Sequence, residues 1–459
     1  MGGVMDAARR FDVSEFLDRS AIGSHRFLIF SLCTLVMVVD GYDVFVVGFV
    51  VPALAHSFGV SPHAIVSVFV LQTIALGLGA YAVAPFADWI GRRKLVLICT
   101  TLFGILTLLS TRSTSVGELS IYRFVASLFF GGVVPNLVAI SSEYGAQRQR
   151  AALVMILFIG YTIGAGGGGY LAALVVSHYG WQGAFWMGGL TPLVFVVILY
   201  FWVPESIQFL VLRDRNAEVA DQLRRIDPKV DLAATAGFTI REEKSGSMPV
   251  IALFRQGRAV ATVALWLSDA MNLFVLTFIA AWAPTFLHAF SGAGAEQAAG
   301  VAALFSLGGI ISPLILGIFM NRYSASRALA VNYVLGALAV ILMGLVAHSV
   351  ALSALGIFLA GLFIIGGQGG INALAAMLYP TEMRATGIGW ALGAGRVGSV
   401  FGPALGGFVL ENHWSAGSIF VVAAIPLVVA AVATICVRFS VYVEPAASAV
   451  PRPTALGSH

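Results

Sequence analysis

The dominant pattern along the chain is a series of long apolar runs separated by short polar segments. A helix needs about 20 mostly apolar residues to cross the hydrocarbon core of a bilayer. Such runs lie near residues 27–54, 64–87, 95–111, 119–142, 152–177, 183–203, 259–287, 297–320, 328–347, 351–379, 386–410 and 416–437. The pattern therefore predicts an all-α membrane protein with twelve transmembrane helices, some long enough to require tilts or kinks.

Composition excludes a soluble globular protein. Of the 459 residues, 59% are hydrophobic and 10% are charged, whereas soluble domains carry about 25% charged residues. Cys33, Cys99 and Cys436 all lie in apolar runs, without the spacing of a metal site or a disulfide framework, so we expect them to be buried side chains. Residues 1–26 have mixed charges and no short apolar region with a cleavage site, which favours a cytoplasmic tail over a signal peptide.

The distribution of positive charge predicts the orientation in the membrane. Cytoplasmic segments of membrane proteins are enriched in Lys and Arg. If both termini are cytoplasmic, only three of the 26 Lys and Arg residues fall outside the inner segments: Arg112 in an outer loop, and Arg123 and Arg396 within spans. An even number of spans also places both termini on one side, so the span count and the charges agree.

The longest internal polar stretch divides the spans six and six. It predicts a cytoplasmic loop, 205–257, between two six-helix bundles at 27–204 and 258–437, with cytoplasmic tails at 1–26 and 438–459. Within the loop, Ser206 to Ile226 is amphipathic and rich in arginine. We expect this segment to be helical and to lie against the inner face of the membrane.

The two halves repeat one another. Spans 4 and 10 align at an offset of 236, which pairs Gly131 with Gly367, Asn136 with Asn372, and Arg148 with Arg384. Spans 5 and 11 align at an offset of 238, which pairs Gly160 with Gly398 and Gly164 with Gly402. Parallel repeats of six spans are typical of the major facilitator fold, in which the substrate binds between the halves near the bilayer midplane.

Ionisable residues within spans are costly and usually functional. Here they are Asp40, Asp43, Arg123, Asp269 and Arg396, with Glu143 at the inner end of span 4. At a rise of about 1.5 Å per residue, Asp269 and Arg396 should lie about 15 Å from the inner ends of their spans, near the midplane. Asp40, Asp43 and Arg123 should lie in the outer half of the first bundle.

Asp40 and Asp43 share a helix face because they are three residues apart. Two carboxylates this close in a low dielectric cannot both be ionised cheaply, so we expect one of them to bind a proton. This predicts a proton-coupling group of Asp40, Asp43, Arg123 and Glu143. Alternatively, Arg123 pairs with one aspartate and holds spans 1 and 4 together, and both roles are compatible if protonation breaks the pair.

The midplane residues predict a binding site for a carboxylate. Arg396 suits this role because a guanidinium forms two parallel hydrogen bonds with a carboxylate; the alternative is a structural pair with Asp269. Amide and aromatic side chains at similar depth, which otherwise serve helix packing, complete the substrate-binding candidates together with Asp269: Asn136, Tyr161, Trp266, Asn272, Phe274, Gln368 and Asn372.

A tight inner turn after span 2 carries Asp88, Gly91, Arg92 and Arg93. Glycine permits such a turn, and the charges can pair across a closed inner gate and separate when it opens. These four residues and Arg148 are the predicted gating residues. Alternatively, the arginines only set the topology.

These motifs resemble those of the aromatic acid:proton symporter family of the major facilitator superfamily. The resemblance covers residues 11–437 and rests on AspGlyTyrAsp at 40–43, AspTrpIleGlyArgArg at 88–93, GlyGlyValValProAsn at 131–136, ProGluSerIleGlnPheLeu at 204–210 and TyrProThrGluMetArgAlaThrGly at 379–387. It implies import of a benzoate-like acid with protons across the bacterial inner membrane. It also implies importance for Asp40, Asp43, Asp88, Gly91, Arg92, Arg123, Glu143 and Arg396.

The chain departs from the family pattern in two places. In the loop motif, Trp89 stands where an arginine is usual, and Asn321 replaces aspartate in the second copy of the loop, which leaves the strength of the gate open. Asp269 lies in a stretch that we expect to be neutral in the family, which favours a more polar or hydroxylated acid.

The sequence thus predicts a secondary transporter that uses protons as the coupling ion and no cofactor or metal. We expect a monomer in the inner membrane that contacts lipid, protons and a small aromatic carboxylate, and no nucleic acid. Alternatives are a carrier of another organic anion, phosphate or a sugar, or an efflux carrier. An enzyme is disfavoured because the eight histidines lie in loops or at span ends without catalytic spacing, and the short tails disfavour a sensor.

Overall fold

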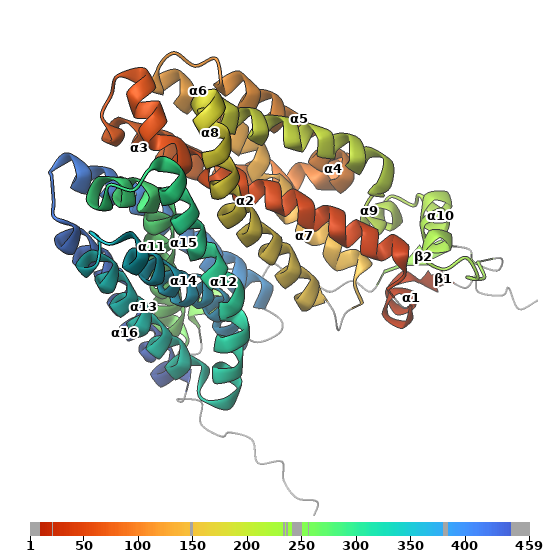
Figure 1. The fold of residues 1–459 in the computed structure, drawn as a ribbon. Coiled ribbons are helices and arrows are strands. Elements are labelled where there is room, and N and C mark those ends of the chain that lie inside the picture. Colours follow the sequence, from red (N-terminus) through yellow and green to blue (C-terminus); the bar gives the residue numbers. More distant parts are fainter. Residues whose placement is uncertain are drawn as a thin grey trace, which may run out of the picture.

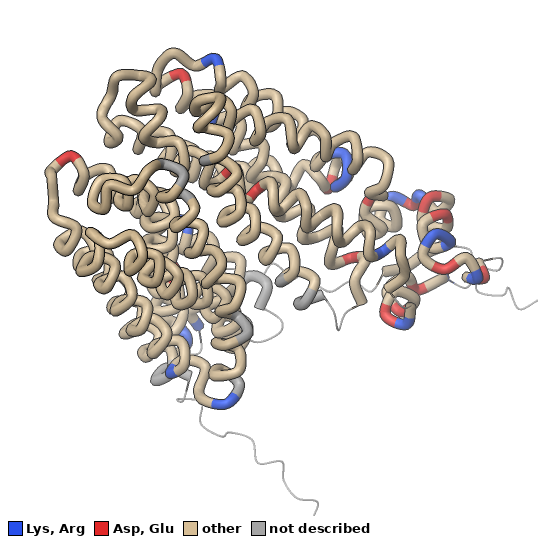
Figure 2. The backbone as a smooth tube through the Cα atoms, viewed as in Figure 1, with Lys and Arg blue, Asp and Glu red and all other residues tan. Residues whose placement is uncertain are grey.

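The computed structural model of the chain describes residues 10–20, 22–146, 150–232, 235, 237–240, 250–255, 257–379 and 384–441. Two bundles of long helices make up most of this part (Figure 1). Charged residues gather at the ends of the helices and around the short helices at one end of the N-terminal bundle, while most of the helical length carries none (Figure 2). Helices that are apolar on all sides fit a lipid environment.

The N-terminal bundle is continuous in sequence from residue 24 to residue 202. Its elements are α2 (Ser24–Phe58), η1 (Pro62–Ile65), α3 (Val66–Ala82), η2 (Ala84–Phe86), α4 (Ala87–Ile90), α5 (Arg92–Ser110), α6 (Val116–Gly131), α7 (Val133–Tyr144) and α8 (Arg150–Trp202). Within α8, Gly180 has non-helical backbone angles, with φ 67° and ψ −172°. The element is therefore two helices, which correspond to the predicted spans 152–177 and 183–203.

The C-terminal bundle consists of six long helices in the described residues. They are α11 (Ala259–Ser291), α12 (Ala295–Arg322), α13 (Ala325–Leu345), α14 (Val350–Leu378), α15 (Arg384–Glu411) and α16 (Ala416–Val441). Pro284, Pro403 and Pro426 lie inside α11, α15 and α16, where a proline interrupts the hydrogen-bond ladder of the helix.

Each of the twelve predicted apolar runs falls in a helical segment. Ten segments in the described part of the chain are long and apolar enough to cross a membrane, and Ile156–Ala172 is a shorter apolar helix. The membrane-spanning part of this multi-pass protein is thus helical. The count of twelve crossings and the cytoplasmic position of both termini stay predictions.

The loop 205–257 contains short helices and a strand. Its elements are α9 (Ile207–Leu212), α10 (Asn216–Ile226), β2 (Gly237–Thr239) and η4 (Val250–Phe254). The strand β1 (Arg10–Asp12) pairs in parallel with β2, and α1 (Val13–Arg19) follows β1 directly. The N-terminal segment and the loop are therefore joined by a small two-stranded sheet.

The prediction for the amphipathic segment 206–226 needs a correction. It is helical, but it forms two helices that break near Asp214, whose φ is 53°. The apolar face of α10 lies against protein in this structure. Val219 and Leu223 are fully buried and pack in one cluster with Val13 and Leu17 of α1. Protein rather than lipid therefore covers this face.

Glycines allow the closest helix contacts within each bundle. Gly41 of α2 abuts the main-chain carbonyl of Tyr161 on α8, and Gly164 of α8 abuts that of Val38 on α2. In the C-terminal bundle, Gly398 of α15 abuts the carbonyl of Ala270 on α11. Small residues at such positions let helices approach until their backbones touch, which holds α2 against α8 and α11 against α15.

The two bundles touch along α2 with α11, α3 with α15, and α8 with α12. Further contacts between the bundles lie at the ends where α2 and α11 finish, which we call the outer ends. There the rings of Phe69 and Trp282 lie 6.1 Å apart. The imidazole of His63 lies 3.4 Å from the carboxylate of Glu411. The bundles are thus in contact at their outer ends in this structure.

The packing predicts that Gly164→Ala lowers stability, because the added Cβ would overlap the Val38 carbonyl and force α2 and α8 apart. Overpacking of this kind costs about 1–3 kcal/mol. The midpoint of thermal unfolding in detergent, followed by size-exclusion chromatography, measures the loss. Gly167→Ala is the matched control, since nothing lies within 4 Å of its added Cβ; equal losses in both variants would contradict the role of Gly164.

Candidate functional site

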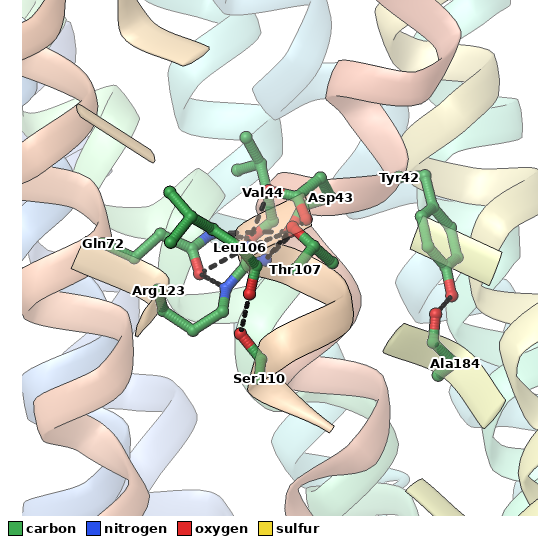
Figure 3. Close-up of polar contacts among 9 residues, drawn as sticks. All are labelled: Tyr42, Asp43, Val44, Gln72, Leu106, Thr107, Ser110, Arg123 and Ala184. Atoms are coloured by element: carbon green, nitrogen blue, oxygen red, sulfur yellow. Dashed lines mark hydrogen bonds and ion pairs between the residues drawn. The ribbon is translucent and has the colours of Figure 1, made fainter. Parts of the chain in front are cut away.

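Asp43 and Arg123 form a buried ion pair between α2 and α6 (Figure 3). Arg123 donates from Nη1 to Asp43 Oδ1 at 2.8 Å and from Nη2 to Oδ2 at 2.6 Å. The side chains are 0% and 4% exposed. Two parallel hydrogen bonds between opposite charges are a strong, directional arrangement, so each charge compensates the other inside the bundle.

Gln72 of α3 completes this pair. Its Oε1 accepts from Arg123 Nε at 3.1 Å and from Nη2 at 3.0 Å, while its Nε2 donates to the carbonyl of Val44 at 3.1 Å. Thr107 of α5 accepts a longer hydrogen bond from Arg123 at 3.4 Å. The guanidinium thus ties four helices together. Sequence reasoning missed Gln72, although a polar residue in the middle of an apolar run was a signal for it.

Asp40 lies one turn away on α2 in a different environment. Its side chain is 3% exposed, and its Oδ1 has no hydrogen-bond partner. In the described part of the chain, no cation lies within ion-pair distance of the Asp40 carboxylate. The nearby Arg123 binds Asp43 instead. Tyr42, between the two aspartates, points away and donates to the carbonyl of Ala184 at 2.7 Å. Asp43 is therefore held as a paired ion, and Asp40 is not.

A second polar group lies in the C-terminal bundle. Asn272 Nδ2 donates to Gln368 Oε1 at 2.9 Å, and Gln368 Nε2 donates to Asp269 Oδ1 at 2.7 Å. Asp269 and Asn272 are 1% and 0% exposed. The structure thus brings three of the predicted substrate-binding residues together in one hydrogen-bonded chain between α11 and α14.

Arg396 lies on α15, within electrostatic range of members of both groups. Its side chain is exposed, and its charge acts electrostatically on Asp40 and Tyr161 of the N-terminal bundle and on Asp269 of its own bundle. It makes no ion pair with Asp269 among the described residues. Arg396 is thus an accessible cation within electrostatic range of a carboxylate from each half.

An apolar cavity lies beside Tyr161, between the bundles. It has a volume of about 60 Å³, and its lining includes Phe45, Phe49, Tyr161 and Phe305. The rings of Phe45 and Tyr161 lie 6.2 Å apart, edge to face. Aromatic walls of this kind suit a flat ring, because aromatic groups prefer offset or edge-to-face contacts.

Three other candidates have different surroundings. Asn136 donates to the carbonyls of Gly132 at 2.8 Å and Ala84 at 3.4 Å, which is a contact within helix packing. Trp266 stacks on Trp390 at 5.9 Å and 18°. Asn372 is half-buried on α14, one turn beyond Gln368. The structure therefore separates Asn136 from the groups around Arg396.

The predicted gating residues form a cluster at the inner end of the N-terminal bundle. Gly91 has a φ of 103°, which requires glycine. Arg92 forms an ion pair with Glu143, and the main-chain nitrogen of Arg93 donates to Glu205 Oε1 at 2.9 Å. Asp88 is exposed, and its carbonyl accepts from Arg213 at 3.1 Å. Arg148 lies outside the described residues.

Glu143 lies in this cluster and not with the other predicted proton-coupling residues. Besides Arg92, it binds the hydroxyl of Ser206, which donates to Oε2 at 2.6 Å. Its position at the inner end of α7 places it far along the bundle from the Asp43–Arg123 pair. Glu205 and Ser206 had no role assigned from the sequence, although both belong to the ProGluSer segment that begins the loop.

Comparisons with known proteins agree with this architecture. A family model described as Major Facilitator Superfamily matches residues 33–366 and 259–457. The chain is 34% identical over 424 residues to the gallate transporter of Pseudomonas putida, covering 92% of this chain and 94% of the relative. It is 32% identical over 430 residues to the 4-hydroxybenzoate transporter PcaK of Pseudomonas putida, covering 93% and 96%.

Solved structures show the same fold. A bacterial homologue of the human lysosomal transporter Spinster, in an inward-facing and unoccupied conformation, superposes with a TM-score of 0.70 at 17% identity, covering 91% of this chain and 98% of that one. Family match, relatives and fold agree along nearly the whole chain. The protein therefore belongs to the Major Facilitator Superfamily and is a multi-pass membrane transporter rather than an enzyme.

Proposed function

We propose that the protein is a proton-coupled symporter that imports a small aromatic carboxylate by alternating access. The observation that carries this proposal is the position of Arg396, an exposed cation within electrostatic range of the buried, unpaired carboxylate of Asp40 in the other half. The named substrates of the relatives, gallate and 4-hydroxybenzoate, support an aromatic acid.

The substrate carboxylate binds Arg396 in this proposal. A guanidinium offers two parallel donors to a carboxylate, and Arg396 is accessible, whereas Arg123 is fully buried and already saturated by Asp43 and Gln72. The ring of the acid lies against the aromatic walls formed by Phe45, Tyr161 and their neighbours. Gln368 and Asn372 supply polar contacts at the edge of the site.

Asp40 carries the proton. An ionised carboxylate buried without a partner costs several kcal/mol, and in the empty protein the nearby charge of Arg396 offsets part of this cost. When the substrate anion occupies Arg396, that compensation is lost and Asp40 binds a proton. Asp43 keeps its charge because Arg123 stays bound to it, so the two aspartates have separate roles.

The same proposal covers topology and gating. Twelve helices cross the inner membrane with both termini in the cytoplasm, and the protein works as a monomer. The contacts at the outer ends of the bundles close the outer side, and the charges of Asp88, Arg92, Arg93 and Glu143 contribute to an inner gate. Their partners in this structure all belong to the N-terminal bundle and the loop.

The first test is proton movement in proteoliposomes that contain the purified protein and an internal pH dye. We expect 4-hydroxybenzoate or another hydroxybenzoate to drive proton entry without an imposed gradient. Asp40→Asn should lower the number of protons that enter with each acid and weaken uphill uptake but leave folding and substrate exchange intact, because the neutral amide cannot bind and release a proton.

Asp221→Asn is the matched control, since Asp221 lies on the exposed face of α10 with 60% of its side chain accessible. Normal accumulation by Asp40→Asn would contradict the coupling role of Asp40. If a sugar moves protons and no aromatic acid does, the fold stands and the substrate proposal is wrong.

A second prediction concerns the substrate carboxylate. Arg396→Lys should weaken binding of 4-hydroxybenzoate by about tenfold or more, because a hydrogen bond to a charged group contributes about 1.5–3 kcal/mol. Equilibrium binding to purified protein measures the change. Arg112→Lys, an exchange at an exposed outer-loop arginine, should bind as the native protein does, and unchanged affinity in Arg396→Lys would refute the carboxylate contact.

A third prediction separates Asp43 from Asp40. Asp43→Asn and Arg123→Gln should each destabilise the protein by about 3–5 kcal/mol, because each leaves a buried charge without its partner. The double variant should lose clearly less than the sum of the two. Unfolding in detergent mixtures gives these free energies, and strictly additive losses would show that the pair is not energetically coupled.

A further inference from the structure

Asp269 is a buried carboxylate for which the proposed transport cycle has no role. It lies on α11, with 1% of the residue exposed. Its Oδ1 accepts one hydrogen bond from Gln368 Nε2 at 2.7 Å, and its Oδ2 has no hydrogen-bond partner. A carboxylate in this position carries acceptor capacity that no donor of the described residues satisfies.

The groups around Asp269 are neutral with one exception. From α14 comes the amide of Gln368, and from α13 the phenol of Tyr333, which donates to the carbonyl of Gly367 at 3.3 Å. Toward α16, the hydroxyls of Ser268 and Thr434 lie 2.9 Å apart and bond to one another. The exception is Arg396 on α15, whose charge acts on Asp269 without forming an ion pair in the described structure.

Gly395 explains how the carboxylate fits beside α15. A Cβ at this position would overlap Asp269 Oδ2. Because Gly395 has no side chain, the carboxylate fits directly beside it, next to Arg396 in the sequence. Asp269 is thus held against the helix that carries the proposed substrate cation. Their separation depends little on movement of one bundle against the other, since α11 and α15 belong to the same bundle and pack through Gly398 and Gly402.

The contrast with Asp43 is informative. Asp43 receives two hydrogen bonds from a guanidinium and is compensated as an ion. Asp269 receives one hydrogen bond from a neutral amide. A buried carboxylate without an ion-pair partner is more stable as the neutral acid, so the geometry of Asp269 favours a protonated form whenever Arg396 is engaged elsewhere.

The internal repeat places Asp269 one turn from the position that is equivalent to Asp40. At an offset of 232, Pro52 aligns with Pro284 and His56 with His288, within the two helices that open the halves. The same offset aligns Asp40 with Asn272, one turn from Asp269 on α11. The unpaired carboxylates therefore lie on equivalent helices of the two halves, and the charge of Arg396 acts on both.

We propose that Asp269 is a second proton-binding residue of the transport cycle, so that each half contributes one exchangeable carboxyl group governed by Arg396. This inference rests on the proposed function. In the empty protein, Arg396 favours the ionised forms of Asp40 and Asp269. When the substrate carboxylate occupies Arg396, both aspartates bind a proton.

The charges balance as follows. The loaded centre holds the guanidinium cation, the substrate anion and two neutral carboxyl groups, and is neutral. The empty centre holds the guanidinium cation and two carboxylates, and has one negative charge. One acid anion and two protons enter in each cycle, so one net positive charge moves inward.

The test is the number of protons taken up when 4-hydroxybenzoate binds to the purified full-length protein. Calorimetry in buffers of different ionisation enthalpy gives this number at neutral pH. We expect Asp269→Asn and Asp40→Asn each to lose about one proton per bound acid relative to the native protein. Asp221→Asn, at an exposed position, should match the native protein.

The native protein provides an independent measurement that does not depend on the folding of a variant. In proteoliposomes, an inside-negative membrane potential should increase accumulation of the acid, because net positive charge enters with it. Accumulation that is equal with and without the potential would overturn the two-proton cycle. In difference infrared spectra, the carbonyl band of protonated carboxyl groups should grow when the acid binds, and less so in Asp269→Asn.

The possible outcomes separate this inference from the proposed function. If Asp269→Asn keeps the native proton number while Asp40→Asn loses one proton, Asp269 is not a proton site and the symport proposal stands. An altered preference between benzoate and 4-hydroxybenzoate at an unchanged proton number would likewise overturn the inference, in favour of a specificity role. If the native protein takes up no proton with any hydroxybenzoate, the proposed function itself fails.

Discussion

A charge inside an apolar bundle must be compensated by other protein groups, because neither lipid nor packed helices can hydrate it. Arg123 meets this constraint through Asp43 and Gln72, and the resulting network joins α2, α3, α5 and α6. The N-terminal bundle is therefore built around one saturated ion pair. Its saturation also explains why Asp40, only one turn away, has no ion-pair partner in the described part of the chain.

Close glycine contacts determine where the remaining charges lie. Gly41 and Gly164 bring α2 against α8, and Gly395 and Gly398 bring α11 against α15. These contacts hold the helices that carry Asp40, Tyr161 and Asp269, and the charge of Arg396 acts on all three residues. When an anionic substrate binds an exposed guanidinium that acts on a carboxylate in each half, the electrostatic environment of both carboxylates changes. Coupling by alternating access requires such a link between the halves.

Different contacts hold the inner end of the N-terminal bundle together. Here Arg92 pairs with Glu143 at the end of α7. Glu205 accepts from the main-chain nitrogen of Arg93, which ties the inner turn to the start of the loop. The small sheet of β1 and β2, with α1 and α10, covers the same end. The N-terminal segment and the loop thus form a layer on one bundle, so movement of that bundle would carry the layer with it.

The sequence by itself determined the helices, the two halves and the positions of the ionisable residues, because apolar runs must become helices in lipid and because spacing along a helix fixes depth. It also identified Gly91, whose positive φ only glycine adopts without strain. Only the tertiary structure decided that Arg123 pairs with Asp43, that Glu143 belongs with Arg92, and that Asp269 binds Gln368 rather than Arg396. Helical periodicity defines which face a residue occupies, but the rotation and approach of neighbouring helices decide which partner meets that face.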